Sequence, residues 1–204
     1  MNLKRALLAS GLAMVFVLTT GVGVASAKNP KATGTVFCGG VNGTGTLNPG
    51  LSAVGSPGGM KITFHGTFAG NCDSAVATPP GVVVTGGTIK GSGFYNAPPG
   101  SPNASACANF LGGDTVGTIT ETIKWTTTGG AIAPTKIVYM NQTGTVTAPP
   151  AVITLMAPPG TATKTGSFAV PLLPNLTKLP TNLPLPACPG TTTHFNIIGG
   201  SINV

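Results

Sequence analysis

The sequence predicts an all-β protein, either an antiparallel β-sandwich or a closed β-barrel of about nine short strands. Three observations predict this fold class. Threonine is frequent, short runs of residues alternate between apolar and polar, and clusters of Gly, Pro and Asn separate these runs. The density of Gly, Pro and Thr leaves no stretch with the spacing of an amphipathic helix.

The predicted strands follow one another at near-regular spacing along the chain. Each is rich in β-branched or aromatic side chains and is bounded by turn-forming residues. They cover residues 33–41, 44–47, 60–69, 82–85 together with 88–95, 115–128, 135–147, 152–156, 167–170 and 193–204.

The first four strands are defined by local turn signals and by alternation. Asn42 and Gly43 separate the first two strands, because this pair is a common hairpin turn. The third strand, residues 60–69, alternates between apolar and polar side chains along its length. Gly86 and Gly87 interrupt the fourth strand and indicate a bulge or a kink.

The fifth and sixth strands flank the loop at residues 129–134 and predict a hairpin. In the fifth strand, threonines and Lys124 alternate with Ile119, Ile123 and Trp125, so one face is polar and the other apolar. We expect Trp125 in the core. The last three strands complete the set.

Residues 171–189 differ from the rest because they are rich in both proline and leucine. Proline cannot donate a ladder hydrogen bond, so this segment is not expected to form a central strand. It is expected to run extended over a sheet edge or an open barrel end and to bury its leucines. The alternative is a proline-rich docking segment for a partner.

Residues 1–27 predict a secretory signal peptide. Lys4 and Arg5 form a basic start, residues 6–18 are apolar, and residues 25–27 form a small-x-small cleavage site. The apolar run is short for a membrane-spanning helix. We therefore expect cleavage between Ala27 and Lys28, and a single secreted β domain over residues 28–204 without a stable membrane anchor.

The charge balance bears on the possible partners. Beyond the predicted signal, the chain holds eight lysines, no arginine and three acidic residues, a net charge of +5. Charged residues make up 6% of the chain, against roughly 25% in average globular proteins. The lysines are scattered singly, without the basic cluster typical of a nucleic-acid surface, so no nucleic-acid partner is expected. Neutral groups, chiefly hydroxyls, must therefore cover the surface. They either keep the protein soluble or form a surface that packs against an uncharged polymer or a protein neighbour.

Cys38, Cys72, Cys107 and Cys188 predict two disulfides, because an even number of cysteines in an exported protein is usually paired. Four cysteines allow three pairings. We prefer Cys72–Cys107 with Cys38–Cys188, since the first and last strands are often neighbours in closed β folds. Each bridge would stabilise the fold by about 3–5 kcal/mol. The spacing does not suit a metal site, because no Cys-x-x-Cys pair occurs.

Short motifs along the chain resemble a group of small secreted Gly/Thr-rich β proteins of actinobacteria. The resembling segments are VFCG at 36–39, LNPGL at 47–51, GNC at 70–72, AC at 106–107 and IKW at 123–125. The resemblance implies export, β structure and paired cysteines. It transfers no catalytic or binding site, because the group has no established activity.

Few side chains suit catalysis, cofactor binding or metal binding. A glycosidase needs two carboxylates that face each other, and only Asp73, Asp114 and Glu121 are available. Asp73 and Asp114 are expected at turns. His65 and His194 are expected to be ordinary surface residues, since no nucleophile elbow, phosphate loop or metal-ligand spacing occurs. We therefore predict no catalytic, cofactor or metal site.

Glu121 is the exception, because strand parity places it on the apolar face of its strand. An edge strand or a partly covered sheet face would explain it, as would pairing with Lys124 or Lys136 across the hairpin. A buried Glu121 with a raised pKa would instead be a functional candidate.

These observations predict a secreted, non-enzymatic structural or interaction module of the cell envelope or extracellular space, with an unknown protein or cell-wall partner and no cofactor. One alternative is an envelope-associated, pore-type or membrane-attached β protein. The other is an extracellular hydrolase that uses Glu121 with His65 or His194.

Overall fold

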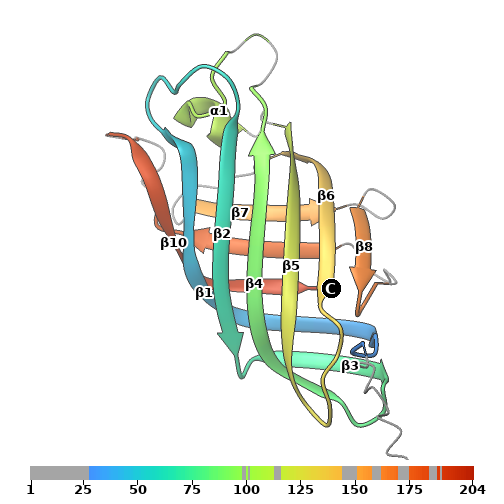
Figure 1. Ribbon diagram of the computed structural model, residues 1–204. Helices are drawn as coiled ribbons and strands as arrows, with labels where there is room; N and C mark the ends of the chain where they lie inside the picture. The colour runs from blue at the N-terminus through green and yellow to red at the C-terminus, as the bar shows by residue number, and fades with distance from the viewer. Residues whose placement is uncertain are drawn as a thin grey trace, which may run out of the picture.

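The structure is a computed structural model, and it shows a protein built almost entirely of antiparallel strands (Figure 1). It describes residues 28–97, 100, 102–112, 116–143, 151–157, 162–169, 175–183, 188 and 190–204. The predicted signal peptide, with the cleavage residue Ala27, and the predicted turn residue Asp114 lie outside these residues. No helix of the described part is long and apolar enough to cross a membrane.

The described residues form ten strands and one short helix, α1 (Cys107–Gly112). The strands are β1 (Thr33–Leu51), β2 (Met60–Ala69), β3 (Cys72–Thr78), β4 (Val83–Tyr95), β5 (Val116–Thr128), β6 (Thr135–Thr143), β7 (Ala151–Ala157), β8 (Ala162–Gly166), β9 (Asn175–Thr181) and β10 (Thr192–Asn203).

One curled sheet contains all ten strands. Nine of them follow the order β7-β9-β10-β1-β2-β4-β5-β6-β8, and β3 pairs with β1 outside this path. Figure 1 shows β2, β4, β5 and β6 standing side by side, while β3, β7 and the first half of β1 cross behind them. The sheet is thus a half-barrel. The predicted all-β fold is confirmed, but a sandwich or a closed barrel is not.

Several predicted boundaries change in the structure. The first two predicted strands merge into β1, because Asn42 and Gly43 lie at a register shift within the strand rather than in a turn. The bulge expected at Gly86 is confirmed by a register shift between Val84 and Gly86 where β4 pairs with β5. Strands β3 and β8 and helix α1 were not predicted, and residues 167–169 form a turn instead of a strand.

The prediction that the Pro/Leu-rich segment forms no central strand is wrong. Part of it is β9, which lies between β7 and β10. Pro180 is tolerated on the β10 side because it falls where the register between β9 and β10 shifts, between Lys178 and Thr181, so no ladder hydrogen bond to β10 is required from it. Leu179 and Leu183 are buried, as expected for this segment. Residues 171–174, 184–187 and 189 lie outside the described part.

The preferred cysteine pairing is also wrong. The structure joins Cys38 to Cys72 and Cys107 to Cys188, with Cα–Cα distances of 4.1 and 6.4 Å, instead of forming Cys72–Cys107 and Cys38–Cys188. The reason is the unpredicted strand β3, which runs antiparallel to β1 and places Cys72 directly opposite Cys38. The cysteine of α1 then pairs with the cysteine that follows β9.

The core lies on the inner face of the curled sheet. Apolar side chains from β1, β2, β4, β5, β6, β7, β9 and β10 are buried there in one cluster. Helix α1 packs over one end of this cluster, where Phe110 contacts Tyr95 edge to face with ring centres 5.7 Å apart. The period-2 alternation of these strands therefore separates a buried inner face from an exposed outer face.

Candidate functional site

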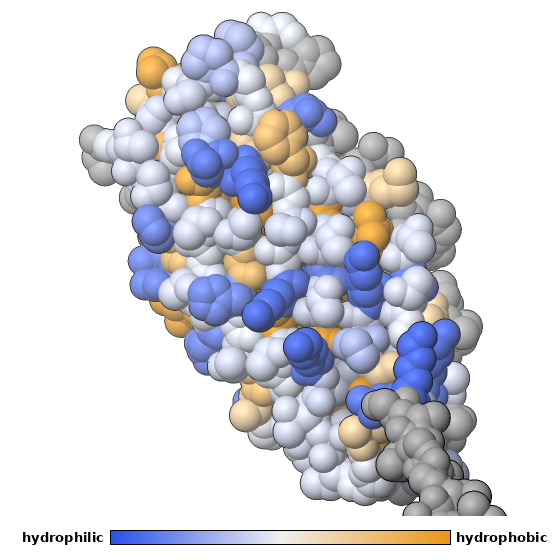
Figure 2. Space-filling model, viewed as in Figure 1, coloured by the Kyte–Doolittle hydropathy of each residue, from blue (hydrophilic) through white to orange (hydrophobic). Residues whose placement is uncertain are grey.

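The outer face of β2, β4, β5 and β6 carries one exposed lysine on each strand. These residues are Lys61, Lys90, Lys124 and Lys136. Strand parity and register place them on the same side of the sheet, with threonine and serine side chains between them. Figure 2 shows this face, where separate hydrophilic side chains are spread over a surface of mostly intermediate hydropathy. We call it the lysine face.

A shallow, open depression of about 530 Å³ lies within the lysine face. It is lined by outward side chains of three neighbouring strands, Thr63, His65, Lys90, Ser92, Thr120 and Thr122. Register aligns His65 with Lys90, and Lys90 with Thr122. Five hydroxyl or imidazole groups and one ammonium group therefore surround one concave area. These groups suit hydrogen bonding to hydroxylated or anionic ligands.

The lysine face carries no acidic residue among those that the structure describes. Asp73 lies on β3, where it is exposed, rather than in the predicted turn. Glu121 lies on the inner face. The positive charges of this face are consequently not neutralised by a neighbouring carboxylate.

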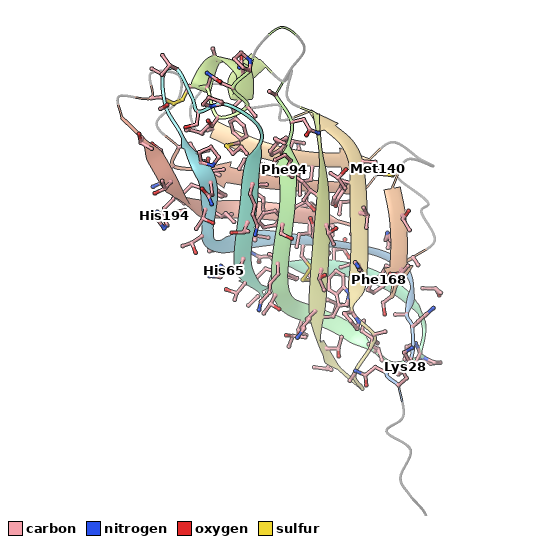
Figure 3. All side chains as sticks on the ribbon, turned by 45° about the horizontal axis from the view of Figure 1, so that its top comes forward. Lys28, His65, Phe94, Met140, Phe168 and His194 are labelled. Atoms are coloured by element: carbon pink, nitrogen blue, oxygen red, sulfur yellow. A yellow bond between two sulfur atoms is a disulfide. The ribbon has the colours of Figure 1, made fainter. Side chains whose placement is uncertain are left out.

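His65 and His194 are both exposed, as predicted. The His65 ring lies 3.2 Å from the Thr44 hydroxyl, and the His194 ring lies 2.8 Å from the Thr193 hydroxyl. Figure 3 shows the two histidines on neighbouring parts of the outer surface, away from the core. Glu121 points to the opposite side of the sheet, so the structure does not bring it together with either histidine.

Glu121 is fully buried, although both structural explanations offered by the sequence are wrong. Strand β5 lies between β4 and β6, so it is not an edge strand, and the face around Glu121 is fully covered. Lys124 and Lys136 lie on the outer face and do not pair with it. Its neighbours within the sheet are Gly91 and Ile137, and the Phe64 ring lies over Gly91.

A small polar cluster surrounds the buried carboxyl group. The Thr177 hydroxyl on β9 donates a hydrogen bond of 3.2 Å to Oε1 of Glu121. The Tyr139 hydroxyl lies 3.4 Å from that of Thr177. Oε2 of Glu121 has no hydrogen-bond partner among the described residues. Because β9 lies across the half-barrel from β5, the cluster connects the two sides of the curled sheet.

Burial raises the pKa of the Glu121 carboxyl group to about 8. The hydrogen bonds of Thr177 and Tyr139 and the charge of Lys164 act in the opposite direction without offsetting the effect of burial. Burial also lowers the pKa of the Lys164 amino group to about 8, although the charge of Glu121 raises it. At neutral pH the carboxyl group is therefore mostly protonated.

Lys164 and Thr177 are neighbours of Glu121 that the sequence did not reveal. Register explains the contribution of Lys164: it pairs with Ile137, which in turn pairs with Glu121, so all three lie in one row on the inner face. The two charged residues are separated by two strand spacings, roughly 10 Å, which a lysine side chain can shorten. Only strand order and register place these residues together, so no local signal could have identified them.

The remaining candidate residues are distributed through the core. Tyr95 and Tyr139 are fully buried, and burial raises the pKa of each phenol above its ordinary value. Trp125 packs against the core but is only partly buried. Within the described residues, no three His, Cys, Asp or Glu side chains gather in a way that would hold a metal ion.

Comparison of the chain with protein families, curated proteins and solved structures gives no match.

Proposed function

We propose that the mature chain is a secreted, non-enzymatic binding module of the cell envelope or extracellular space, and that its lysine face binds an anionic, hydroxyl-rich polymer. The observation that carries this proposal is the arrangement of the lysine face, with one exposed lysine on each of four consecutive strands and rows of hydroxyl groups between them. The two disulfides are consistent with a location outside the cell.

The lysine face favours a polymer over a small ligand. Its depression is shallow and open, whereas a small molecule is usually held in an enclosed pocket. Lys90 and Lys136 lie in the same row, separated by Thr122, so they are roughly 10 Å apart along the sheet. A polymer with repeated negative charges can contact several such lysines at once, and the linked contacts add up to useful affinity.

The test compares binding to immobilised polygalacturonate, a polymer of acidic sugars, with binding to dextran, a neutral polymer. We expect binding to polygalacturonate alone, and we expect salt to weaken it because the lysines are exposed. Lys90→Gln should weaken binding by ~2–5-fold, since an exposed charge pair contributes up to about 1 kcal/mol. Lys90→Gln combined with Lys136→Gln should weaken it further.

Lys178→Gln is the matched control, because Lys178 is an exposed lysine on β9, outside the lysine face. It removes the same charge and should leave polymer binding nearly unchanged. Equal binding to dextran and polygalacturonate would overturn the proposal. An equal loss of affinity in the Lys90 and Lys178 variants would also overturn it, because attraction would then depend on net charge rather than on this face.

A further inference from the structure

A second depression, of about 330 Å³, lies where the β5–β6 loop meets the first residues of the predicted mature chain. It is lined by Asn29, Lys124, Trp125, Ala131, Ile132 and Pro134. We call it the Trp125 pocket. Its volume is at the lower end of the range for small-ligand sites, which suits a single ring rather than a long segment of polymer.

The Trp125 ring is held in a fixed orientation. The Phe68 and Phe168 rings meet it edge to face, with ring centres 6.0 and 5.1 Å away. Its indole N–H donates a 2.9 Å hydrogen bond to the Thr135 hydroxyl, which donates a 2.7 Å hydrogen bond to the carbonyl of Ser167. The polar atom of the indole is thus used internally, and the ring offers the pocket an apolar surface.

The start of the described chain, which contributes Asn29 to the lining, is held in place by hydrogen bonds. The Pro30 carbonyl accepts a hydrogen bond from the N–H of Ala133. The N–H of Ala32 donates a hydrogen bond to the Ser167 hydroxyl, and the Ala32 carbonyl accepts one from the N–H of Phe168. Phe168 itself has a φ of 56°, a conformation that residues other than glycine rarely adopt. Figure 3 shows Lys28 and Phe168 at the same end of the molecule. Strained backbone that is held by several contacts is common at binding sites.

The groups that line the pocket divide into an apolar and a polar set. Trp125, Ile132 and Pro134 supply apolar surface, against which the C–H groups of a sugar ring can pack. Asn29 can both donate and accept hydrogen bonds to hydroxyl groups. Lys124 adds a positive charge, and no carboxylate lines the pocket. A ring that carries hydroxyl groups and one carboxylate complements both sets.

Lys124 also belongs to the lysine face, where it pairs through the β4–β5 ladder with Thr88. The pocket therefore continues the surface proposed to bind the polymer. We propose that the Trp125 pocket binds one acidic sugar unit, such as a uronic acid, of that polymer. This inference rests on the proposed function but uses a different part of the surface and a different ligand for its test.

Trp125 is the single tryptophan of the chain, so its fluorescence reports directly on this pocket. We expect galacturonic acid, added to the oxidised mature protein, to change the tryptophan emission in a saturable way. Galactose, which lacks the carboxylate, should bind about tenfold more weakly, because a hydrogen bond to a charged group is lost. Inorganic phosphate tests whether any small anion is sufficient.

Lys124→Gln should weaken the affinity for galacturonic acid by ~2–5-fold, since Lys124 is exposed, and Asn29→Ala, also at an exposed position, should weaken it without disturbing the core. Lys178→Gln is the matched control, because Lys178 is an exposed lysine on β9 that neither lines the pocket nor belongs to the lysine face. A response of the same size to galactose, to phosphate, or in the Lys124 variant would overturn the inference, as would no response at all.

The two proposals fail separately. Loss of the tryptophan response with intact, Lys90-dependent binding of polygalacturonate would refute the sugar pocket and leave the lysine face supported. A saturable response to galacturonic acid without Lys90-dependent polymer binding would refute the lysine face as the polymer site.

Discussion

Glu121 is fully buried, which is rare for a glutamate. A carboxylate enclosed among apolar side chains is unfavourable in its charged form, because burial removes it from water. The carboxyl group therefore stays protonated over most of the physiological pH range, and the Thr177 hydroxyl donates a hydrogen bond to it. Glu121 is thus maintained as a neutral hydrogen-bonding group whose charge appears only at alkaline pH.

The Glu121 pKa predicts how stability depends on pH. In the unfolded chain the group ionises near 4.5, and in the folded protein at about 8. Between these values the folded state retains a proton that the unfolded state has released, so the free energy of unfolding falls by about 1.4 kcal/mol per pH unit. The stabilising effect is complete below pH 4.5 and is lost as the pH rises through 8.

Lys164 acts in the opposite sense at higher pH. Its pKa falls from 10.5 to about 8, so above that value the unfolded chain binds more protons and stability rises with pH. The contribution is smaller because Lys164 is only partly buried. We therefore expect a minimum of stability near pH 8, measurable as the urea midpoint across the range from weakly acidic to alkaline pH.

Glu121→Gln should abolish the decline in the free energy of unfolding between pH 4.5 and 8, because the amide cannot ionise. The variant should be more stable than the natural protein near pH 8 and similar to it in acid. Asp73→Asn removes an exposed carboxyl group and is the matched control, which should retain the decline. If Glu121→Gln and the natural protein lose stability in parallel, the group is not protonated in the folded state.

At the scale of elements, β1 organises the sheet. Its 19 residues pair with β2, β3 and β10, so it contacts three of the other nine strands. The first half pairs with β3 and the second half with β2, and the bend between them carries the strand from one side of the half-barrel to the other (Figure 1). The Cys38–Cys72 bridge lies at this change of partner.

The pairing of the strands predicts which cysteine peptides are joined. Trypsin cleaves after lysine, and the lysines of this chain separate all four cysteines into different peptides. Digestion without reductant should recover the Cys38 peptide joined to that of Cys72, and the Cys107 peptide joined to that of Cys188. Recovery of a Cys72–Cys107 pair would show that β3 does not lie beside β1.

Removing either bridge should lower stability, and slightly more for the bridge that closes the longer loop. The bridges join residues 34 and 81 positions apart. Chain entropy then predicts a loss of about 3.7 kcal/mol for Cys38→Ala with Cys72→Ala, and about 4.5 kcal/mol for Cys107→Ala with Cys188→Ala. Denaturation in urea measures both, and the difference from the natural protein should vanish when a reductant is present.

The whole molecule separates its two kinds of surface by the curl of one sheet. Among the described residues the inner face is mostly apolar, with Glu121 and a few hydroxyl side chains buried in it. The outer face carries hydroxyl groups and single lysines, together with exposed apolar side chains such as Phe94 and Met140. Few charges are sufficient because threonine suits an exposed, pleated surface and hydrogen-bonds to water. The exposed lysines of the lysine face are the charges that we propose bind the polymer.

Export of the whole chain can be tested by mass. We expect the protein recovered from the medium to begin at Lys28 and to lack one hydrogen for each cysteine, because the signal is removed and the thiols are oxidised. Ala27→Asp should block removal of the signal peptide, since the cleavage site requires a small residue. The longer precursor should then accumulate. A secreted chain that keeps residues 1–27 would contradict the expected cleavage.

Local alternation was sufficient to predict part of the fold. Strand β2 was predicted with its observed bounds, and the β5–β6 hairpin nearly so, because side chains in a strand point to alternate faces wherever the strand lies. The same rule placed Glu121 on the apolar face of its strand and Lys124 on the polar face, and both positions agree with the structure. These properties depend on neighbouring residues only, so they can be recognised along the chain.

Contacts between distant segments could not be recognised in this way. The pairing of Cys38 with Cys72, the position of β9 between β7 and β10, and the meeting of Thr177 and Lys164 with Glu121 all depend on strand order and register. Many orders of the same strands satisfy the same alternation, and packing of the complete core selects one of them. The amino-acid pattern therefore determined which side chains face inward, and the tertiary fold determined which of them meet.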